Sequence, residues 1–256
     1  MRKLLIIPII LIGFLFIPLS SKGADFTTGL VGRWTLDARD VNWGTNIVLD
    51  RSWQGRYGTT TNMTASAVSM GKIGQSLYFN GNTTAGLHSY VTLINPGTVL
   101  NGGYLTVSAW IKPTAFPNSY PRIVDRIYNG QFALYLVGAS RELSYAIATA
   151  GGNVDRAANS TCTGMASSTW HHVALTWDGT TVNAYDNGVV CDSLTGGISG
   201  GLDSSAASIR IGQRVEIASG NRGFGGYIDD VRIYNRAFTQ QEVKDLYRHG
   251  LRSRKY

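Results

Sequence analysis

The stretch from residue 170 to residue 191 constrains the fold most, because it contains two consecutive hairpin signals. Two runs rich in β-branched and aromatic residues, 170–177 and 181–185, are separated by Asp178-Gly179. The triplet Asp186-Asn187-Gly188 then turns the chain toward a third apolar run. Asp-Gly and Asn-Gly pairs favour the tight turns that connect antiparallel strands. This region therefore predicts a series of neighbouring antiparallel strands.

Similar short runs recur along the chain, bounded by Gly, Asn or Pro. In the clearest of them, Leu105, Val107, Ala109 and Ile111 alternate on one face, and Pro113 ends the run. The same reasoning predicts further strands at 30–37, 73–79, 90–93, 122–126, 131–137, 143–149, 208–211 and 227–234. Many short strands with turn residues between them predict an all-β chain that forms an antiparallel β-sandwich of the jelly-roll type.

One short C-terminal helix is predicted after the last strand. Thr239 and Glu242 have the spacing of a capping box. Val243, Leu246 and Tyr247 then form an apolar stripe at helical spacing. We expect this helix to cover part of the sandwich.

The first 23 residues have the pattern of an export signal. Arg2 and Lys3 precede an apolar run from 4 to 19, and Ser21 and Gly23 place small residues before a cleavage point. We expect a signal peptide at 1–23, a single domain at 24–256, and a secreted, periplasmic or cell-surface protein with no membrane span after cleavage. An uncleaved anchor is the alternative.

The charge of the chain is mildly basic. The formal charge of +7 falls to +4 when the three basic residues of the signal, Arg2, Lys3 and Lys22, are removed. The remaining basic residues are scattered, apart from a terminal cluster, so no nucleic-acid partner is expected. An anionic glycan would be attracted weakly and in a salt-sensitive way.

Cys162 and Cys191 are the two cysteines of the chain. In an oxidising compartment such a pair forms a disulfide by default, and neither cysteine belongs to a CxxC metal motif. We expect a disulfide between them.

Several segments, taken in order, resemble the LamG-like jelly-roll domains of the concanavalin A-like lectin and glucanase superfamily. The resemblance rests on segments 29–37, 72–81, 107–113, 170–188 and 225–246 and on the loop at Asp50 and Ser52. It implies a jelly-roll fold for nearly all of the mature chain. It restricts function less, because this fold carries lectin modules, adhesion modules, glycosidase appendages and hydrolases.

The resemblance also implies a structural calcium ion at one edge of the sandwich. Asp37 and Asp229 match the acids that supply side-chain oxygens, with carbonyl groups of the 40–50 loop completing the shell. Asp40 and Asp50 are rival acids in that loop.

Asp229 and Asp230 stand next to each other in the last predicted strand. Alternation with Val231 and Ile233 directs Asp229 toward the interior, where a lone carboxylate needs a metal or an arginine. Asp230 is the weaker metal candidate, and the alternative is that one acid pairs with Arg232.

Loop aromatic residues are the first candidates for glycan contact. Trp43, Trp53 and Tyr57 lie among polar loop residues, where sugars could stack on their rings. A second candidate patch contains Tyr120, Arg122, Arg126 and Tyr128. The other tryptophans, Trp34, Trp110, Trp170 and Trp177, are predicted to belong to the core. His171 and His172 are adjacent on a strand and point to opposite faces, which does not suit a shared metal.

The sequence lacks the motifs of two hydrolase classes, although its composition leaves Ser-His-Asp hydrolysis open. The superfamily's retaining glucanases carry an ExDxxE-like run, but the glutamates here are Glu142, Glu216 and Glu242, and no GxSxG motif occurs. We therefore expect a non-catalytic binding module with a polysaccharide or cell-surface glycan as ligand. The alternative is a protein-interaction or adhesion module that binds other surface proteins. A glycoside hydrolase or lyase that acts through Glu142 or Glu216 is the third hypothesis.

Overall fold

The computed structural model describes residues 25–253 apart from 83, 85, 95–96, 102, 117–119, 127–129, 158 and 216–221. The predicted signal peptide at 1–23, Tyr128 and Glu216 lie outside the described residues. Within the described part, no helix is both long and apolar enough to cross a membrane.

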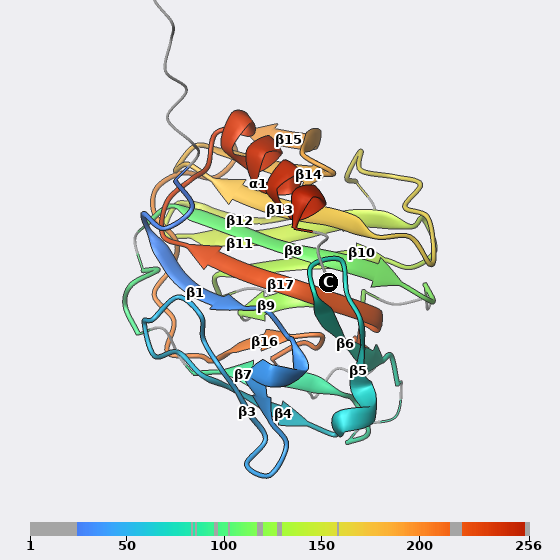
Figure 1. Cartoon of the computed structure of the whole chain (residues 1–256). Helices are drawn as coiled ribbons and strands as arrows, with labels where there is room; N and C mark the ends of the chain where they lie inside the picture. The colour runs from blue at the N-terminus through green and yellow to red at the C-terminus, as the bar shows by residue number, and fades with distance from the viewer. Residues whose placement is uncertain are drawn as a thin grey trace, which may run out of the picture.

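Two antiparallel sheets form the body of the molecule, as the sequence predicts (Figure 1). The eight-stranded sheet has the order β15 (Val189–Thr195), β14 (Thr181–Asp186), β13 (His171–Trp177), β8 (Leu105–Pro113), β17 (Gly225–Tyr234), β6 (Gln75–Asn80) and β5 (Val68–Met70), with β1 (Leu30–Trp34) also paired to β17. The nine-stranded sheet has the order β12 (Gly152–Asp155), β11 (Glu142–Thr149), β10 (Phe132–Val137), β9 (Arg122–Arg126), β16 (Ile209–Ile211), β7 (Tyr90–Leu93), β4 (Gly58–Thr61), β3 (Ile47–Val48) and β2 (Val41–Asn42). Two short 3₁₀ turns, η1 (Ala38–Asp40) and η2 (Ala65–Ala67), lie between strands.

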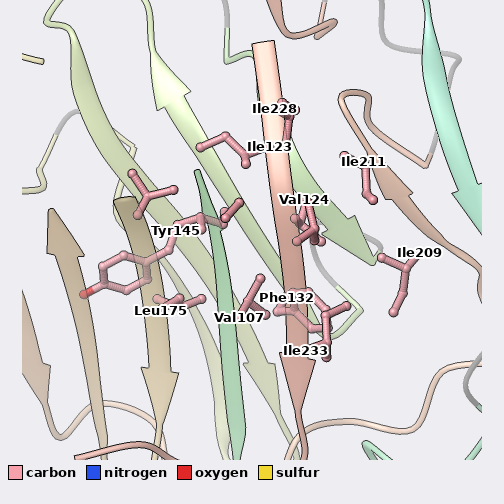
Figure 2. Packing of buried hydrophobic residues seen from close by; sticks show 14 of the residues in the cluster. Val107, Ile123, Val124, Phe132, Tyr145, Leu175, Ile209, Ile211, Ile228 and Ile233 are labelled. Atoms are coloured by element: carbon pink, nitrogen blue, oxygen red, sulfur yellow. The ribbon is translucent and has the colours of Figure 1, made fainter. Parts of the chain in front are cut away.

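The main hydrophobic core lies between the two sheets. Val107, Ile228 and Ile233 of the eight-stranded sheet belong to the same fully buried cluster as Phe132 and Ile209 of the nine-stranded sheet (Figure 2). Full burial of an aliphatic side chain of this size contributes about 1.5–3 kcal/mol. The apolar alternation of the strands is thus the source of the sandwich's stability.

Strand β17 changes partner halfway along its length. Residues 225–228 pair with β6, and residues 231–234 pair with β1. Its other edge pairs with β8, but the register shifts between Asp229 and Arg232, and Asp230 has a φ of 44°. One extra residue on a strand is a β-bulge, which changes the face on which the following side chains lie. The bulge falls where the partner changes.

Helix α1 (Gln240–Arg252) lies on the outer face of the eight-stranded sheet (Figure 1). Thr239 and Glu242 form the predicted capping box. Val243 and Leu246 pack with Ala174 and Tyr234 in a second buried cluster. The predicted role of this helix as a cover is confirmed.

The disulfide prediction is also confirmed. Cys162 and Cys191 are bonded, and their Cα atoms are 4.8 Å apart. The bond ties the segment after β12 to β15 at the edge of the eight-stranded sheet. It closes a loop of 29 residues of sequence separation, which on chain-entropy grounds stabilises the fold by roughly 3–4 kcal/mol.

Candidate functional site

A pocket of about 870 Å³ lies beside the bulge of β17. Its wall is formed by the end of β1, the η1 turn, the segment 70–75 and the two adjacent acids of β17, and Ser253 lies at its margin. Four carboxylates, from Asp37, Asp40, Asp229 and Asp230, and three arginines line it. Segments that are far apart in the sequence thus place carboxylates and guanidinium groups around one pocket.

Asp230 is held by two arginines. Its Oδ1 accepts a 2.7 Å hydrogen bond from Nε of Arg33, and its Oδ2 accepts one of 2.9 Å from Nε of Arg232. Burial alone would raise the pKa of Asp230, but the charges of Arg232 and Arg33 hold it below its ordinary value. Asp230 is therefore an ionised carboxylate whose charge is already neutralised by protein groups.

No arginine of the described residues is paired with Asp229. Its Oδ2 accepts backbone hydrogen bonds from Lys72 at 2.7 Å and Ile73 at 2.8 Å, whereas its Oδ1 is buried without a hydrogen-bond partner among the described residues. Burial raises the pKa of Asp229 well above its ordinary value, and the nearby charges of Asp230 and Asp37 raise it further. This carboxylate needs either a proton or a cation from solution.

Asp37 holds the same loop from its other end. Its Oδ1 accepts a 2.6 Å hydrogen bond from the backbone N–H of Gln75, and its Oδ2 is 3.4 Å from the exposed guanidinium of Arg39. The loop passes close to both acids, because a Cβ added at Gly71 would lie 2.6 Å from Asp229 Oδ2 and one at Gly74 would lie 2.6 Å from Asp37 Oδ1. The two carboxylates and the 71–75 loop form one unit.

The donor set of this unit fits a hard cation. Asp230 is paired with Arg33 and Arg232, and Asp40 is paired with Arg51 and Thr35. The remaining pocket acids are Asp229 and Asp37, and Asp37 has the exposed Arg39 beside it. Among the described residues no group of three or more His, Cys, Asp or Glu side chains is placed to hold a metal. Asp37 and Asp229 could therefore hold a calcium ion only together with neutral oxygens, which calcium accepts readily.

The direction of Asp229 differs from the sequence-based expectation. Asp229 is fully buried, as expected, but it pairs with Trp110 on the outer face of the sheet and not between the sheets. Ile228 takes the core position instead. The side chains of Asp229 and Val231 do not lie on the same face, because the bulge inserts one extra residue between these two positions.

Asp50 does not line the pocket. It organises the loop that follows it: Oδ1 accepts from the backbone N–H groups of Arg33 at 3.0 Å and Ser52 at 2.8 Å, and Oδ2 accepts from Arg56 at 2.9 Å. The carboxylate is thus used in holding a loop and is separate from the Asp37–Asp229 unit.

The loop fixed by Asp50 carries the most exposed tryptophan of the described residues. Trp53 is 88% exposed and has a φ of 67°, and Tyr57 is 45% exposed. Trp43, in contrast, is half-buried and packs against the main core, so it does not belong to an exposed aromatic group. Of the three predicted loop aromatics, two are presented to solvent.

The second predicted patch is split by the structure. Tyr120 is half-buried, with Arg222 over its ring, and Arg122 lies fully buried over Tyr135, with 4.1 Å between guanidinium and ring centre. Arg126 is fully buried and donates to Gln131 Oε1 at 2.7 Å and to loop carbonyls, which are structural roles. Tyr128 is not among the described residues.

The histidines have structural partners. His171 contacts the Asp186 carboxylate through Nδ1 at 3.0 Å, and burial lowers the pKa of His172 to about 3, so that its ring stays neutral. The two rings point to opposite sides, as predicted from their adjacency, since His172 stacks with Trp110 on the outer face.

Three of the four predicted core tryptophans, Trp34, Trp110 and Trp177, are at most 2% exposed. Trp110 is buried under α1 on the outer face and not in the main core. Trp170 is half-buried and contacts the ring of Tyr227, so the prediction of a core position for it is wrong. A tryptophan one residue before a strand keeps part of its ring in solvent.

Glu142 has no free carboxylate oxygen. Its Oε1 accepts from the Ser160 backbone at 2.8 Å, and its Oε2 accepts from Ser140 at 2.9 Å. It therefore helps to anchor the segment near the disulfide.

Sequence reasoning missed the parts of the pocket that come from backbone groups and from β1. The amides of residues 72, 73 and 75 and the guanidinium of Arg33 carry no motif of their own. The one available signal was Gly71-Lys72-Ile73-Gly74, whose paired glycines permit the close approach to the two acids.

Comparisons with solved structures agree with the fold. Domain 4 of AbnA, a GH43 extracellular arabinanase from Geobacillus stearothermophilus solved with arabinotriose, is 25% identical over 85% of this chain and 98% of that domain, with a TM-score of 0.63. The binding domain of Paraclostridial Mosquitocidal Protein 1 is 16% identical, with a TM-score of 0.63, over 87% of this chain and 52% of its own. The binding domain of botulinum neurotoxin DC, in complex with SialylT, is 14% identical, with a TM-score of 0.60, over 88% and 52%.

A search of curated protein sequences found no relative. A family model described as the concanavalin A-like lectin/glucanases superfamily matches residues 80–244, which is more than half of the chain. With this family match over more than half of its length and two antiparallel sheets around one core, the chain belongs to the concanavalin A-like lectin/glucanase superfamily.

Proposed function

We propose that this chain is an exported, non-catalytic glycan-binding module, with Trp53 and Tyr57 as its sugar-contacting rings. The observation that carries the proposal is the 88% exposure of Trp53 on a loop that the Asp50 carboxylate fixes through three backbone hydrogen bonds. An exposed ring of this size gains no stability from burial in the fold, and sugars stack on such rings. The fixed loop reduces the entropy that binding would cost.

The structural neighbours support this class of function. One is a domain of an arabinanase solved with arabinotriose, and another is a toxin binding domain solved with SialylT. A role in binding also fits a chain whose Glu142 is used in structural hydrogen bonds. An extracellular location agrees with the apolar N-terminal segment of the sequence and with these neighbours.

Calcium is proposed as a structural ion at Asp37 and Asp229. Support comes from the unpartnered Oδ1 of Asp229 and from the raised pKa of that group, since a bound cation would supply the charge that the pocket lacks. Arg51 pairs with Asp40 in the wall of the same pocket and immediately follows Asp50, so the ion would also steady the start of the Trp53 loop.

The test is a glycan array followed by titration calorimetry with the purified mature protein. Trp53→Ala should weaken binding of the best glycan by at least about tenfold, which corresponds to about 1.4 kcal/mol. Val189→Ala is the control, because Val189 is also an exposed apolar residue, at 61%, but lies on strand β15 and not on the Trp53 loop. Both variants should keep the wild-type melting temperature within a few degrees.

Binding that survives Trp53→Ala unchanged would refute the assignment of the loop. An array without any bound glycan, together with capture of a surface protein that Trp53→Ala abolishes, would replace the glycan by a protein ligand.

A further inference from the structure

Three aromatic rings and one lysine lie next to one another on the outer face of the eight-stranded sheet. We call it the aromatic row and define it as Tyr78, Tyr227, Trp170 and Lys112. Tyr227 pairs directly with Tyr78 on β6 and with Lys112 on β8. Its ring centre is 5.1 Å from that of Tyr78 and 6.5 Å from that of Trp170. The three rings therefore form one continuous surface over neighbouring strands.

The row faces away from the main core. Leu77 and Phe79 on either side of Tyr78, and Ile228 next to Tyr227, are core residues, so the tyrosines lie on the opposite face. Tyr78 is 38% exposed, and the other three members are half-buried. Figure 1 shows β6, β17, β8 and β13 side by side at this face.

Positive charge accompanies the rings. Nζ of Lys112 lies 5.4 Å from the ring centre of Tyr227, and Nζ of Lys72 lies 4.8 Å from that of the neighbouring Trp110. Lys112 forms no ion pair within the described part of the chain. The nearest acid on β17, Asp229, is turned to backbone amides of residues 72 and 73. The surface therefore combines ring faces with the ammonium group of Lys112.

We propose that the aromatic row is a second binding site, for an anionic polysaccharide chain. The tyrosine and tryptophan rings contact the C–H faces of successive sugar units, and Lys112 pairs with an acidic group of the chain. The charge of the surface selects an anionic chain over a neutral one. This proposal rests on the proposed function for one point, that the ligand is a glycan. The two sites are separate, because the row lies on the first half of β17 and the Trp53 loop is bonded to β1.

The experiment measures binding of the mature protein to polygalacturonate, to neutral galactan and to a single-stranded oligo(dT), at low and at moderate salt. The double variant Tyr78→Ala/Lys112→Gln should weaken polygalacturonate binding at least about tenfold. Its binding to galactan should stay within about twofold, and the salt dependence of polygalacturonate binding should become shallower, because an ammonium contact is lost. Both positions are at least partly exposed, and Tyr78→Phe, which keeps the ring, should retain binding.

Lys244→Gln is the matched control, because it removes one exposed lysine from α1 and leaves the row intact. An equal loss in Lys244→Gln and in the row variant would overturn the site, since the binding would then depend only on net charge. Unchanged polygalacturonate binding in the row variant would also overturn it. Oligo(dT) binding that depends on Tyr78, with none to polygalacturonate, would make the row a nucleic-acid surface.

The two proposals fail separately. Trp53→Ala should leave polygalacturonate binding at the row within about twofold, and the row variant should leave binding at the Trp53 loop unchanged. A protein that binds polygalacturonate only through Trp53 would refute the row while supporting the loop.

Discussion

Arg33 and Asp230, which are 197 positions apart in the sequence, are joined by a 2.7 Å hydrogen bond from Nε to Oδ1. Arg232 donates to the other oxygen of the same carboxylate. The side chain of Arg232 is only 5% exposed, so its charge depends on Asp230 for neutralisation. This cluster sits where β17 passes from β6 to β1 and couples the first strand to the last.

Removal of Asp230 should therefore be costly. Asp230→Ala leaves a buried guanidinium without a counter-ion, and breaking a buried pair in this way costs about 3–5 kcal/mol. Asp245→Ala is the control, because its partner Arg248 is half exposed and such surface pairs contribute about 0–1 kcal/mol. Urea unfolding of the two variants measures the difference. Equal unfolding midpoints would contradict the view that Asp230 is needed to neutralise Arg232.

Calcium should raise the melting temperature of chelated protein. An ion that binds only the folded state at 100 times its Kd stabilises by about 2.7 kcal/mol, which is several degrees for a chain of this size. Asp37→Asn should abolish the rise, whereas Asp178→Asn, at an exposed turn, should not. Differential scanning calorimetry with calcium, with magnesium and with chelator alone is the measurement. A rise that persists in Asp37→Asn would place the ion elsewhere.

Gly74 and Gly55 form a matched pair for testing the loop beside Asp37. Both have a left-handed φ, +68° and +71°, so alanine costs about 1–2 kcal/mol of backbone strain at either position. A Cβ at Gly74 would meet Asp37 Oδ1 at 2.6 Å, whereas one at Gly55 meets nothing within 4 Å. Gly74→Ala should therefore destabilise more and should also reduce the response to calcium. The measurement is the melting temperature of both variants with and without calcium. Equal melting temperatures and equal calcium responses would contradict the proposed role of the loop beside Asp37.

The pair of His171 and Asp186 should make stability depend on pH. Burial lowers the pKa of His171, but the hydrogen bond and charge of Asp186 outweigh it and leave the pKa above the ordinary 6.5. The folded state thus binds this proton more tightly than the unfolded state. The added stability is full below pH 6.5 and is lost as pH rises through the folded pKa. Between pH 6 and pH 9, the midpoint of urea unfolding should fall more in the wild type than in His171→Gln. Parallel curves of midpoint against pH for the two proteins would contradict a stabilising pair of His171 and Asp186.

Local patterns predicted the parts of the structure that depend on neighbours in sequence. The Asp178-Gly179 and Asn187-Gly188 turns and the capping box at Thr239 depend on a few adjacent residues, and all are present. The pairing of Cys162 with Cys191 followed from their number and from the oxidising compartment that an export signal implies.

The positions that sequence misjudged depend on distant segments. The direction of Asp229 is set by a bulge that arises because β17 must serve both β6 and β1. The packing of Trp43 against the core and the partial exposure of Trp170 depend on which strands lie beside them. Likewise, the residues around Asp230 in the sequence do not indicate that Arg33 is its second partner.

The place of β17 in the sheet has a consequence for synthesis. Gly225–Tyr234 is the last strand in the chain, yet it lies between β8 and β6 and also carries β1. Until the ribosome has released these residues, the eight-stranded sheet consists of two separate parts and a loose first strand. The fold therefore cannot close from the N-terminus during translation. Closure of the eight-stranded sheet is thus a late event in synthesis, which follows the pairing of the last strand with β8, β6 and β1.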